Sequence, residues 1–513
     1  MRVIQTAGIV IALASTFARP FDVHAQRDAA TMGTVGVSPS VARLTELLEV
    51  VNGGDSGAMR AYLQENSLGT RTNQGWAAML LPMVLDLYRL SHGLDLVRVT
   101  TIGSQQIQPQ LEGYTVGILR NRATGDEQAL AIAVESQPPY RIIGLPVLHP
   151  SLIAMLVRPT VSTARTEEAR LLEIGAYLKR LEAADIFSGV VVIARDGKPV
   201  FSEAYGYADR DRKIPNTLST PFLLGSMNKL FTGLAIGQLV EQGKLSYDDP
   251  LSKFLPDFPD PKSAKKIRIA NLLSHTSGLG DYTTSKTYNE SLDRMRTVAA
   301  VVDAAGREPP RFEPGTKWSY SNTGFVLLGR IIEIVTGEDY YEYMGKNVFR
   351  PAGMTSTSFP VLPRDGVATV EMAYPYEIEF DGERLRAVNK LGAGYRRGSP
   401  SGVGVASALD LIEFDNALRA GRVVKPETFR LHSSPKPELG APNYGYGYSI
   451  RARMANRPLV GHGGNALGQC TEFGALRDTP YTIVVLSNLT IGTCMSVTGK
   501  ILQVLAPSTT PER

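Results

Sequence analysis

The chain has 513 residues, of which 43% are hydrophobic and 20% are charged, and its formal net charge is +4. This composition is typical of a globular protein and excludes a disordered or fibrous chain. The small net charge, without a long basic run, argues against a nucleic-acid partner. Because a single hydrophobic core rarely grows beyond about 250–300 residues, two domains are expected.

Residues 1–25 have the features of a cleavable signal peptide. Arg2 gives a positive start, residues 7–17 (AGIVIALASTF) are apolar, and Ala25 ends a Val-His-Ala cleavage site. The apolar run is shorter than the roughly 18 residues that cross a bilayer, and Arg19 follows it closely. We therefore expect a bacterial periplasmic or secreted protein, with no integral membrane segment once the signal is removed.

Residues 40–148 combine a helical pattern with a strand pattern. Apolar residues recur at helical spacing from Leu44 to Val51, and two further helices are expected before residue 91. Strand-like runs then follow at 96–102, 114–120, 128–134 and 140–145. The segment is predicted to be a small α+β domain, and the order and size of its elements resemble the NTF2-like fold.

Residues 149–167 form a linker containing proline, serine and threonine, and residues 168–510 are expected to form the second domain. A helix is predicted over 168–183, and two strands flank the hairpin signal Asp196-Gly197. Further strands are predicted at 446–454, 469–476 and 481–486, before a final helix at 496–505. We expect the first and last strands to share one antiparallel sheet.

Ser226 and Lys229 form a Ser-x-x-Lys string that opens an amphipathic helical pattern. Backbone N–H groups gather around a serine at a helix N-terminus, and a lysine one turn on is able to take its proton. The same string occurs at Ser263, in a charged loop, and at Ser433, just before a proline. The alternative for Ser226 is an ordinary N-cap, and the string alone does not decide between the two.

Two further clusters lie later in the chain. In WSYSN (318–322), Tyr320 is a candidate proton relay if nearby cations lower its usual pKa of about 10, and Asn322 is a candidate amide donor to a substrate carbonyl. In VGHGGNALGQ (460–469), two glycines after His462 let another backbone approach closely. The alternatives are a tyrosine packing a turn, an asparagine capping the next helix, and a surface histidine in a glycine-rich turn.

In this order, Ser-x-x-Lys, Tyr-x-Asn and His-x-Gly resemble the motif triplet of the serine β-lactamase and penicillin-binding family. The phrases LLSHTSGL (272–279), KLSYDDPLSKFLPDFP (244–259) and EPGTKWSYSN (313–322) add to the resemblance, which covers about residues 170–510. The group includes class C β-lactamases, D-Ala-D-Ala carboxypeptidases and family VIII esterases. The resemblance implies an α/β (α+β) architecture, in which an antiparallel sheet is flanked by helices and accompanied by a helical subdomain.

The resemblance also implies roles for individual residues. Ser226 attacks a carbonyl and forms an acyl-enzyme, Lys229 and Tyr320 share its proton, and Asn322 orients the substrate. The oxyanion is expected between the backbone N–H of Ser226 and that of Asn465, which follows His462, Gly463 and Gly464.

At the third motif, lactamases of this family carry Lys-Thr-Gly, whose lysine attracts a substrate carboxylate. This chain has His462, which with a pKa near 6.5 would be mostly neutral at pH 7. The sequence therefore favours an esterase or D-amino-acid peptidase acting on a small molecule or peptide. The alternatives are a β-lactamase, a penicillin-binding sensor without turnover, and an idle scaffold whose first domain binds; the natural substrate and oligomeric state stay open.

No cofactor or metal is expected, because none of the six histidines has metal-ligand spacing. The resemblance implies a structural role for His275. Cys470 and Cys494 are the two cysteines, and they either pair, as export would allow, or remain separate buried thiols.

Overall fold

The computed structural model describes residues 38–68, 75–101, 115–145, 162–285, 288–305, 309–380, 385–394, 396–453, 457–489 and 493–505. Pro39–Arg513 form one compact unit. The predicted signal peptide and most of the predicted linker lie outside the described residues, so the boundaries at 25, 148 and 168 stay predictions.

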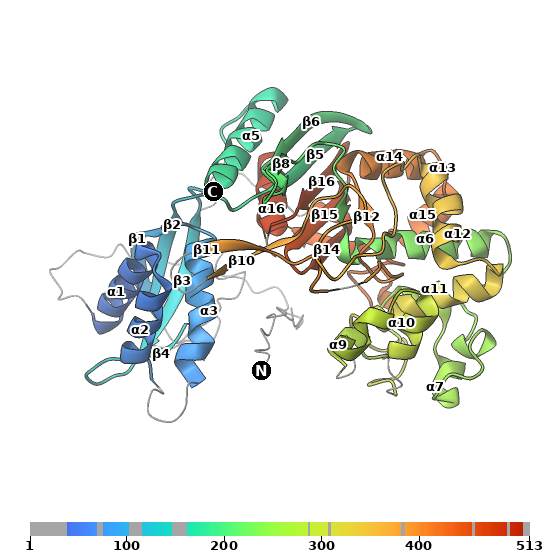
Figure 1. Cartoon of the computed structure of the whole chain (residues 1–513), viewed down its shortest axis with the longest axis horizontal. Helices are drawn as coiled ribbons and strands as arrows, with labels where there is room; N and C mark the ends of the chain where they lie inside the picture. The colour runs from blue at the N-terminus through green and yellow to red at the C-terminus, as the bar shows by residue number, and fades with distance from the viewer. Residues whose placement is uncertain are drawn as a thin grey trace, which may run out of the picture. The chain divides into compact units, whose positions relative to one another are not determined.

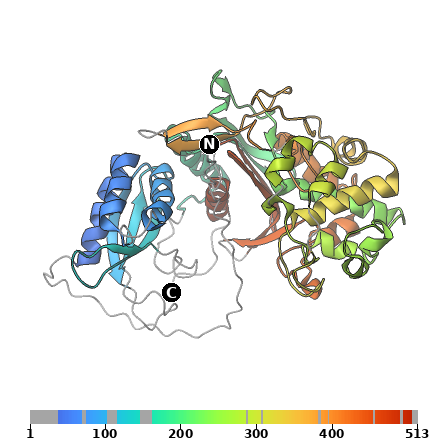
Figure 2. The same ribbon diagram turned by 60° about the horizontal axis from the view of Figure 1, so that its bottom comes forward.

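Within its described residues, the first part of the chain has three helices and four strands in an α+β arrangement (Figures 1 and 2). Its helices are α1 (Pro39–Gly53), α2 (Ser56–Asn66) and α3 (Gly75–Arg89). Its strands are β1 (Leu94–Thr101), β2 (Thr115–Asn121), β3 (Glu127–Val134) and β4 (Ile142–Gly144). The sheet is antiparallel in the order β1-β2-β3-β4.

Local sequence explains these elements. Gly54 takes a positive φ of 69° after α1, and the Asp55 side chain accepts a hydrogen bond from the backbone N–H of Ala58 at 2.7 Å to start α2. Leucines of the helices pack with Leu119 and Leu130 of the sheet in one core. The predicted α+β class is therefore confirmed here, whereas the specific NTF2-like topology stays a prediction.

A six-stranded antiparallel sheet dominates the rest of the chain (Figure 1). Its strands are β5 (Gly189–Arg195), β6 (Lys198–Tyr205), β13 (Ser449–Arg453), β14 (Arg457–Ala466), β15 (Gln469–Leu476) and β16 (Tyr481–Ser487). The order is β13-β14-β15-β16-β5-β6. The prediction that the first and last strands share one sheet is confirmed, since β16 pairs with β5 from Tyr481↔Arg195 to Ser487↔Gly189.

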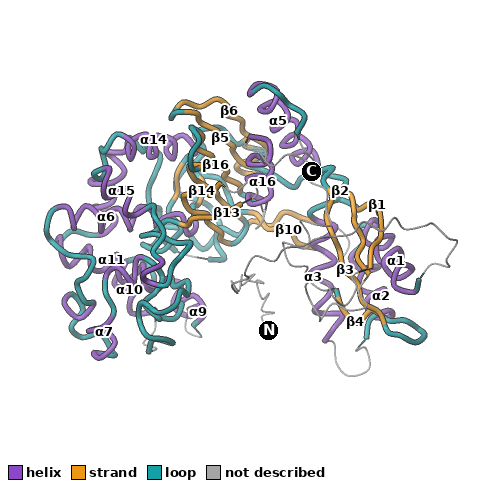
Figure 3. The backbone as a smooth tube through the Cα atoms, turned by 180° about the vertical axis from the view of Figure 1, so that it is seen from behind, coloured by secondary structure: helices purple, strands orange, loops and turns teal. Residues whose placement is uncertain are grey.

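Both faces of this sheet are covered, which explains why β5 reads as the unbroken apolar run GVVVIA. Val190 and Val192 face one core with helices α6 (Asn228–Glu241), α11 (Asn322–Thr336) and α14 (Ala408–Arg419). Val191 and Ile193 face a second core with α5 (Glu167–Ala183) and α16 (Thr493–Leu505). Figure 3 shows α5 and α16 beside the sheet from behind.

Shorter elements complete the helical part and its loops. The helices are α7 (Pro261–Lys266), α8 (Ile269–Leu273), α9 (Tyr288–Ser291), α10 (Val298–Ala304), α12 (Tyr340–Met344), α13 (Arg350–Ala352) and α15 (Pro426–His432). Two-stranded pairings join β7 (Tyr207–Asp209) to β8 (Ile214–Pro215), β9 (Phe222–Leu223) to β12 (Val405–Ala406), and β10 (Tyr376–Phe380) to β11 (Leu385–Asn389).

Two local predictions need correction. Helix α6 is buried on every side from Asn228 to Leu239, not amphipathic, because other segments pack against its glycines and its polar side chains are bonded internally. Ser263 lies on the short helix α7, not in a loop, because Asp260 caps its first turn. The alternative of a surface histidine in a glycine-rich turn is excluded, because His462 is buried within the ten-residue strand β14.

Candidate active site

Ser226 lies in a 3₁₀ turn, η2 (Gly225–Met227), that runs directly into α6. Neither Leu224 nor Met227, the N-cap residues of these two elements, makes a side-chain cap, and Ser226 is not an N-cap. Gly225 has a φ of 53°, and a Cβ there would lie 2.7 Å from the backbone nitrogen of Asn465. The glycine therefore lets the turn carrying Ser226 approach strand β14 closely.

Lys229 lies one turn into the same structure and is completely buried. Its Nζ is 3.2 Å from Ser226 Oγ, 2.7 Å from Asn322 Oδ1 and 2.5 Å from the backbone oxygen of Ser401. The predicted Ser-x-x-Lys pair is thus in direct contact, and the Tyr-x-Asn segment meets it from a position more than ninety residues away.

Burial lowers the pKa of Lys229 to about 7, while the carboxylate of Asp281 acts in the opposite direction. A large fraction of a lysine with this pKa is neutral at pH 7. A neutral amine keeps two N–H donors and one lone pair. The two shorter contacts, to Asn322 and Ser401, accept those two hydrogens, which leaves the lone pair for the hydroxyl of Ser226.

Tyr320 and Asn322 are held at the start of α11. Ser321, between them, is the N-cap whose hydroxyl accepts from the N–H of Gly324, so Asn322 is not the cap. Lys229 Nζ lies 4.8 Å from the centroid of the Tyr320 ring. The amide nitrogen of Asn322 donates to Asp281 Oδ2 at 2.8 Å, so it is engaged within the protein.

His275 packs against the segment that carries Tyr320 and Ser321, in the structural role that the family resemblance implied. It is 1% exposed, its Nδ1 accepts from the backbone N–H of Ser321 at 3.1 Å, and its ring centroid is 4.2 Å from that of Tyr320. Burial, with Lys229 and His462 nearby, holds its pKa well below the usual range, so the ring is neutral.

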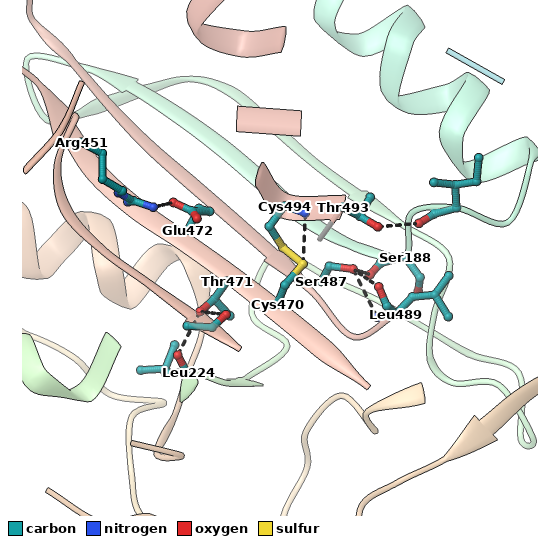
Figure 4. The surroundings of a disulfide bond; sticks show 12 residues. Ser188, Leu224, Arg451, Cys470, Thr471, Glu472, Ser487, Leu489, Thr493 and Cys494 are labelled. Atoms are coloured by element: carbon teal, nitrogen blue, oxygen red, sulfur yellow. Dashed lines mark hydrogen bonds and ion pairs between the residues drawn. A yellow bond between two sulfur atoms is a disulfide. The ribbon is translucent and has the colours of Figure 1, made fainter. Parts of the chain in front are cut away.

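Strand β14 brings the third motif to the turn of Ser226. Strand β13 pairs with β14 only up to Gly461, so the residues from His462 onward have no β13 partner within the described part of the sheet. At Gly464, a Cβ would lie 1.8 Å from the backbone oxygen of Leu224, and Thr471 Oγ1 donates to that same oxygen at 2.9 Å (Figure 4). Gly464 and Thr471 thus fix the distance between β14 and the turn of Ser226.

His462 is buried, which corrects the expected ordinary pKa. It is 5% exposed, and its Nε2 is 2.9 Å from the hydroxyl of Tyr444. Burial, with Lys229 nearby, lowers the pKa of His462 to about 3. The side chain is therefore neutral at all ordinary pH values, so it gives a substrate carboxylate no charge and cannot become a charged group on mild acidification.

The two other Ser-x-x-Lys strings bring no reactive pair together. Ser263 Oγ donates to Asp260, and Lys266 pairs with Glu313. Ser433 Oγ donates to a backbone oxygen, and the lysine of its string does the same.

Cys470 and Cys494 form a disulfide that joins the start of β15 to α16, with their Cα atoms 5.8 Å apart (Figure 4). This settles the alternative left open by the sequence. Cys470 pairs in register with Asn465 of β14, so the bond lies one strand away from the candidate oxyanion strand. In the described residues, no group of three or more His, Cys, Asp or Glu side chains is placed to hold a metal ion.

A comparison with known families matches residues 175–498 to the profile of the Beta-lactamase family. The chain belongs to the beta-lactamase family. The match spans the Ser-x-x-Lys, Tyr-x-Asn and His-x-Gly motifs and confirms the resemblance that they indicated. As a member of the beta-lactamase family, the protein is a serine hydrolase with the fold of the penicillin-binding proteins.

Relatives in this family differ in what their names say they act on. A penicillin-binding protein of Bacillus subtilis named PbpX is 30% identical over 65% of this chain and 78% of its own. The teichoic acid D-alanine hydrolase of Staphylococcus aureus is 34% identical over 38% of this chain and 45% of its own length. The crystal structure of a penicillin-binding protein from Bacillus halodurans superimposes with a TM-score of 0.56 and 27% identity, covering 66% of this chain and 99% of that one.

Two residues that make hydrogen bonds to Lys229 or Asn322 were not predicted. Ser401 contributes a backbone oxygen, which any residue type supplies, so no sequence signal marks it. Asp281 follows the LLSHTSGL phrase by two positions and binds Asn322. Its position just after that phrase was a usable signal, although nothing in the residue pattern said which side chain it would meet.

Proposed function

We propose that the protein is an exported serine hydrolase that cleaves ester or D-amino-acid amide bonds through an acyl-enzyme on Ser226. The observation that carries the proposal is the 3.2 Å contact between Ser226 Oγ and Nζ of the buried Lys229. A serine hydroxyl is a weak nucleophile until an adjacent base takes its proton, and a lysine with a pKa of about 7 is such a base at neutral pH.

In the proposed acylation step, Ser226 Oγ bonds to the substrate carbonyl carbon while its proton passes to Lys229 Nζ. The oxyanion is accepted by the backbone N–H groups of Ser226 and Asn465. The proton then returns through Lys229, with Tyr320 as the proposed relay, to the departing alcohol or amine. Water later attacks the acyl-enzyme and regenerates the hydroxyl of Ser226.

Asn322 receives a different role from the one first expected. Its amide oxygen accepts from Lys229 and its amide nitrogen donates to Asp281, so neither group points to a substrate in this arrangement. We therefore assign Asn322 to the positioning of Lys229. Substrate orientation is left to strand β14, whose residues from His462 to Ala466 pair with β15 on one side but have no β13 partner among the described residues on the other.

The substrate class rests on charge. The neutral His462 lies where lactamases of the family carry a lysine, so a substrate carboxylate would find no cation at this residue. A substrate without such a carboxylate, such as a simple ester or a D-aminoacyl ester or amide, loses no binding interaction when histidine stands in place of the lysine. The relative named teichoic acid D-alanine hydrolase supports D-alanyl groups as a first choice.

The test is a substrate panel of p-nitrophenyl esters, D-alanine p-nitroanilide and a chromogenic cephalosporin. We expect steady turnover of an ester or D-alanyl compound, and its loss in Ser226→Ala with the melting temperature unchanged. A cephalosporin with the highest kcat/KM would contradict the substrate class. A stoichiometric burst without turnover would indicate a penicillin-binding sensor, which the names of several relatives keep as the second candidate.

Export is proposed on two observations. The sequence opens with the pattern of a signal peptide, although those residues lie outside the described structure. The Cys470–Cys494 disulfide is a bond that persists in oxidising compartments. Among the described helices, none has the length and hydropathy that a bilayer crossing requires. N-terminal sequencing of the protein from the culture medium or periplasm would test cleavage after Ala25.

A further inference from the structure

Asp281 is a hydrogen-bond partner of Asn322, which in turn contacts Lys229, and its two carboxylate oxygens accept hydrogen bonds from different segments. Its Oδ1 accepts from the backbone N–H of Thr283 at 3.0 Å and from Thr283 Oγ1 at 2.7 Å, within the short turn η4 (Tyr282–Thr284). Its Oδ2 accepts from Asn322 Nδ2 at 2.8 Å and from the backbone N–H of Asn322 at 3.3 Å. One oxygen is therefore anchored in its own turn, and the other is aimed at Asn322.

This arrangement fixes which way round the amide of Asn322 lies. With the amide nitrogen on Asp281, the amide oxygen faces Lys229 Nζ at 2.7 Å. The flipped amide would place its oxygen against the carboxylate and its N–H groups against the lysine, so both contacts would be lost. Without Asp281 the two orientations would be closer in energy, and Lys229 would lose a permanent acceptor.

Asp281 also adds a negative charge near Lys229. The other titratable groups that face the lysine are Tyr320, whose ring it overlies, and the imidazoles of His275 and His462. Both imidazoles are kept neutral by burial, with Lys229 as a further cause. Burial lowers the pKa of Lys229, and Asp281 is the group that opposes this shift.

We propose that Asp281 is a positioning residue of the reaction: through the amide of Asn322 it holds Lys229 against Ser226, and it places a carboxylate close to this buried amine. This inference deepens the proposed function and rests on it, because it takes Lys229 as the base. The hydrogen bonds of the Asp281 carboxylate go to Thr283 and Asn322, and not to Ser226 or Lys229.

The central experiment compares wild type with Asp281→Asn, which keeps the shape of the side chain but removes its charge. We expect the acidic limb of the kcat/KM–pH profile to move to lower pH by about one unit, the scale expected when an opposite charge near a buried amine is lost. We also expect kcat at the pH optimum to fall about tenfold or more, because Asn322 is no longer held. Asp281→Glu keeps the charge, and its acidic limb should stay near that of wild type.

Titration of Lys229 by NMR of ¹³C-lysine-labelled protein provides a reading that does not need activity. The signal is assigned by its absence in Lys229→Arg, and its midpoint should fall in Asp281→Asn by the same shift as the limb. This separates two failures. An active Ser226→Ala would overturn the proposed function, whereas an unmoved Lys229 midpoint would overturn the role of Asp281 alone.

Asp260→Asn is the matched control. Asp260 also caps a short helix and accepts from a nearby hydroxyl, that of Ser263 at 2.5 Å, and the structure gives it no contact with Lys229. We expect its pH profile to match wild type. Loss of an ordinary helix cap would lower kcat/KM by the same factor at every pH and leave the acidic limb of the profile in place. If Asp281→Asn behaves in this way, the proposal is wrong.

Discussion

All three side-chain hydrogen bonds of Lys229 involve its Nζ, and substitution by arginine separates the charge of this side chain from its ability to accept a proton. In Lys229→Arg the positive charge remains, but a guanidinium does not deprotonate in proteins and is unable to accept the proton of Ser226. We expect the acylation rate to fall by about 10²–10⁴-fold, the range of general-base catalysis. Stopped-flow measurement of the p-nitrophenol burst checks this.

The second Ser-x-x-Lys string supplies the control for this prediction. Lys266 is exposed and pairs with Glu313, so Lys266→Arg should leave the burst unchanged. A Lys229→Arg protein that acylates at the wild-type rate would mean that the lysine acts through its charge alone.

At the residue scale, the sequence predicted the candidate site residues whose side chains belong to a motif. Ser226, Lys229, Tyr320 and Asn322 were predicted together, and the structure brings them together. The burial of His462 was not predictable, because it depends on Tyr444 and on a sheet register that only the folded chain defines. The pKa of 6.5 assumed for His462 was therefore wrong.

Among the elements, strand β14 approaches the turn of Ser226 so closely that only glycine fits at 464. In Gly464→Ala the new Cβ would meet the backbone oxygen of Leu224 at 1.8 Å, so the strand and the turn must separate. Because a displacement of about 1 Å in a catalytic site is able to cost about 10²-fold, we expect kcat to fall by about that factor. Steady-state kinetics with the preferred ester, alongside a melting curve, measures the effect.

Gly499 is the matched glycine. It lies within α16, and outside its own turn of helix no atom of the described residues is within 4 Å of the place where its Cβ would be. Gly499→Ala should keep full activity and raise the free energy of unfolding by about 0.5–1 kcal/mol, because alanine loses less entropy in a helix. Equal losses of activity in the two variants would contradict a specific role for Gly464.

The disulfide between β15 and α16 should contribute to stability more than to catalysis. It closes a loop with a sequence separation of 24 residues, for which the chain-entropy estimate is about 3 kcal/mol. We expect the double variant Cys470→Ala/Cys494→Ala to lose about this much unfolding free energy in urea. Added reductant should destabilise wild type and leave the double variant unchanged; equal sensitivity of both proteins would contradict the assignment.

Element positions were largely predictable, and element environments were not. The predicted strands at 469–476 and 481–486 match β15 and β16 within one residue, because apolar runs bounded by turns define them. The sequence of α6 looked amphipathic because its glycine, threonine and glutamine residues were taken to face solvent. In the fold, Thr232 binds Tyr340 and Gln238 binds two backbone oxygens, contacts that come from distant segments.

At the scale of the whole molecule, three buried neutral histidines among the described residues (His275, His432 and His462) make the fold sensitive to acid. Burial lowers the pKa of His432 to about 3, as it does for His462, against about 6.5 in an unfolded chain. As pH falls below about 6.5, the unfolded state binds protons that the folded state does not. Stability is therefore complete above pH 6.5 and is lost progressively toward pH 3.

His432 tests this without touching the site, because it packs on α6 at Gly237 and bonds to the hydroxyl of Tyr247 at 2.7 Å. In His432→Gln, the loss of unfolding free energy between pH 6 and 4 should be shallower by about 1.4 kcal/mol per pH unit, the contribution of one proton. Urea denaturation at half-unit pH steps measures both slopes. Above pH 7 the curves should run parallel, and curves that stay parallel down to pH 4 would contradict the linkage.

The pairing of β5 with β16 also has a consequence for how the protein is made. Gly189 pairs with Ser487, which is synthesised about 300 residues later. At roughly 5–20 residues per second, the ribosome needs about 15–60 s to synthesise the chain between them. During that interval the segment VVVIA of β5 lacks the partner that it has in the finished sheet. Short, uncharged runs of β-branched residues are prone to aggregate in this state. High-level expression should therefore yield inclusion bodies unless a holding chaperone, or slower translation at low temperature, protects the nascent strand.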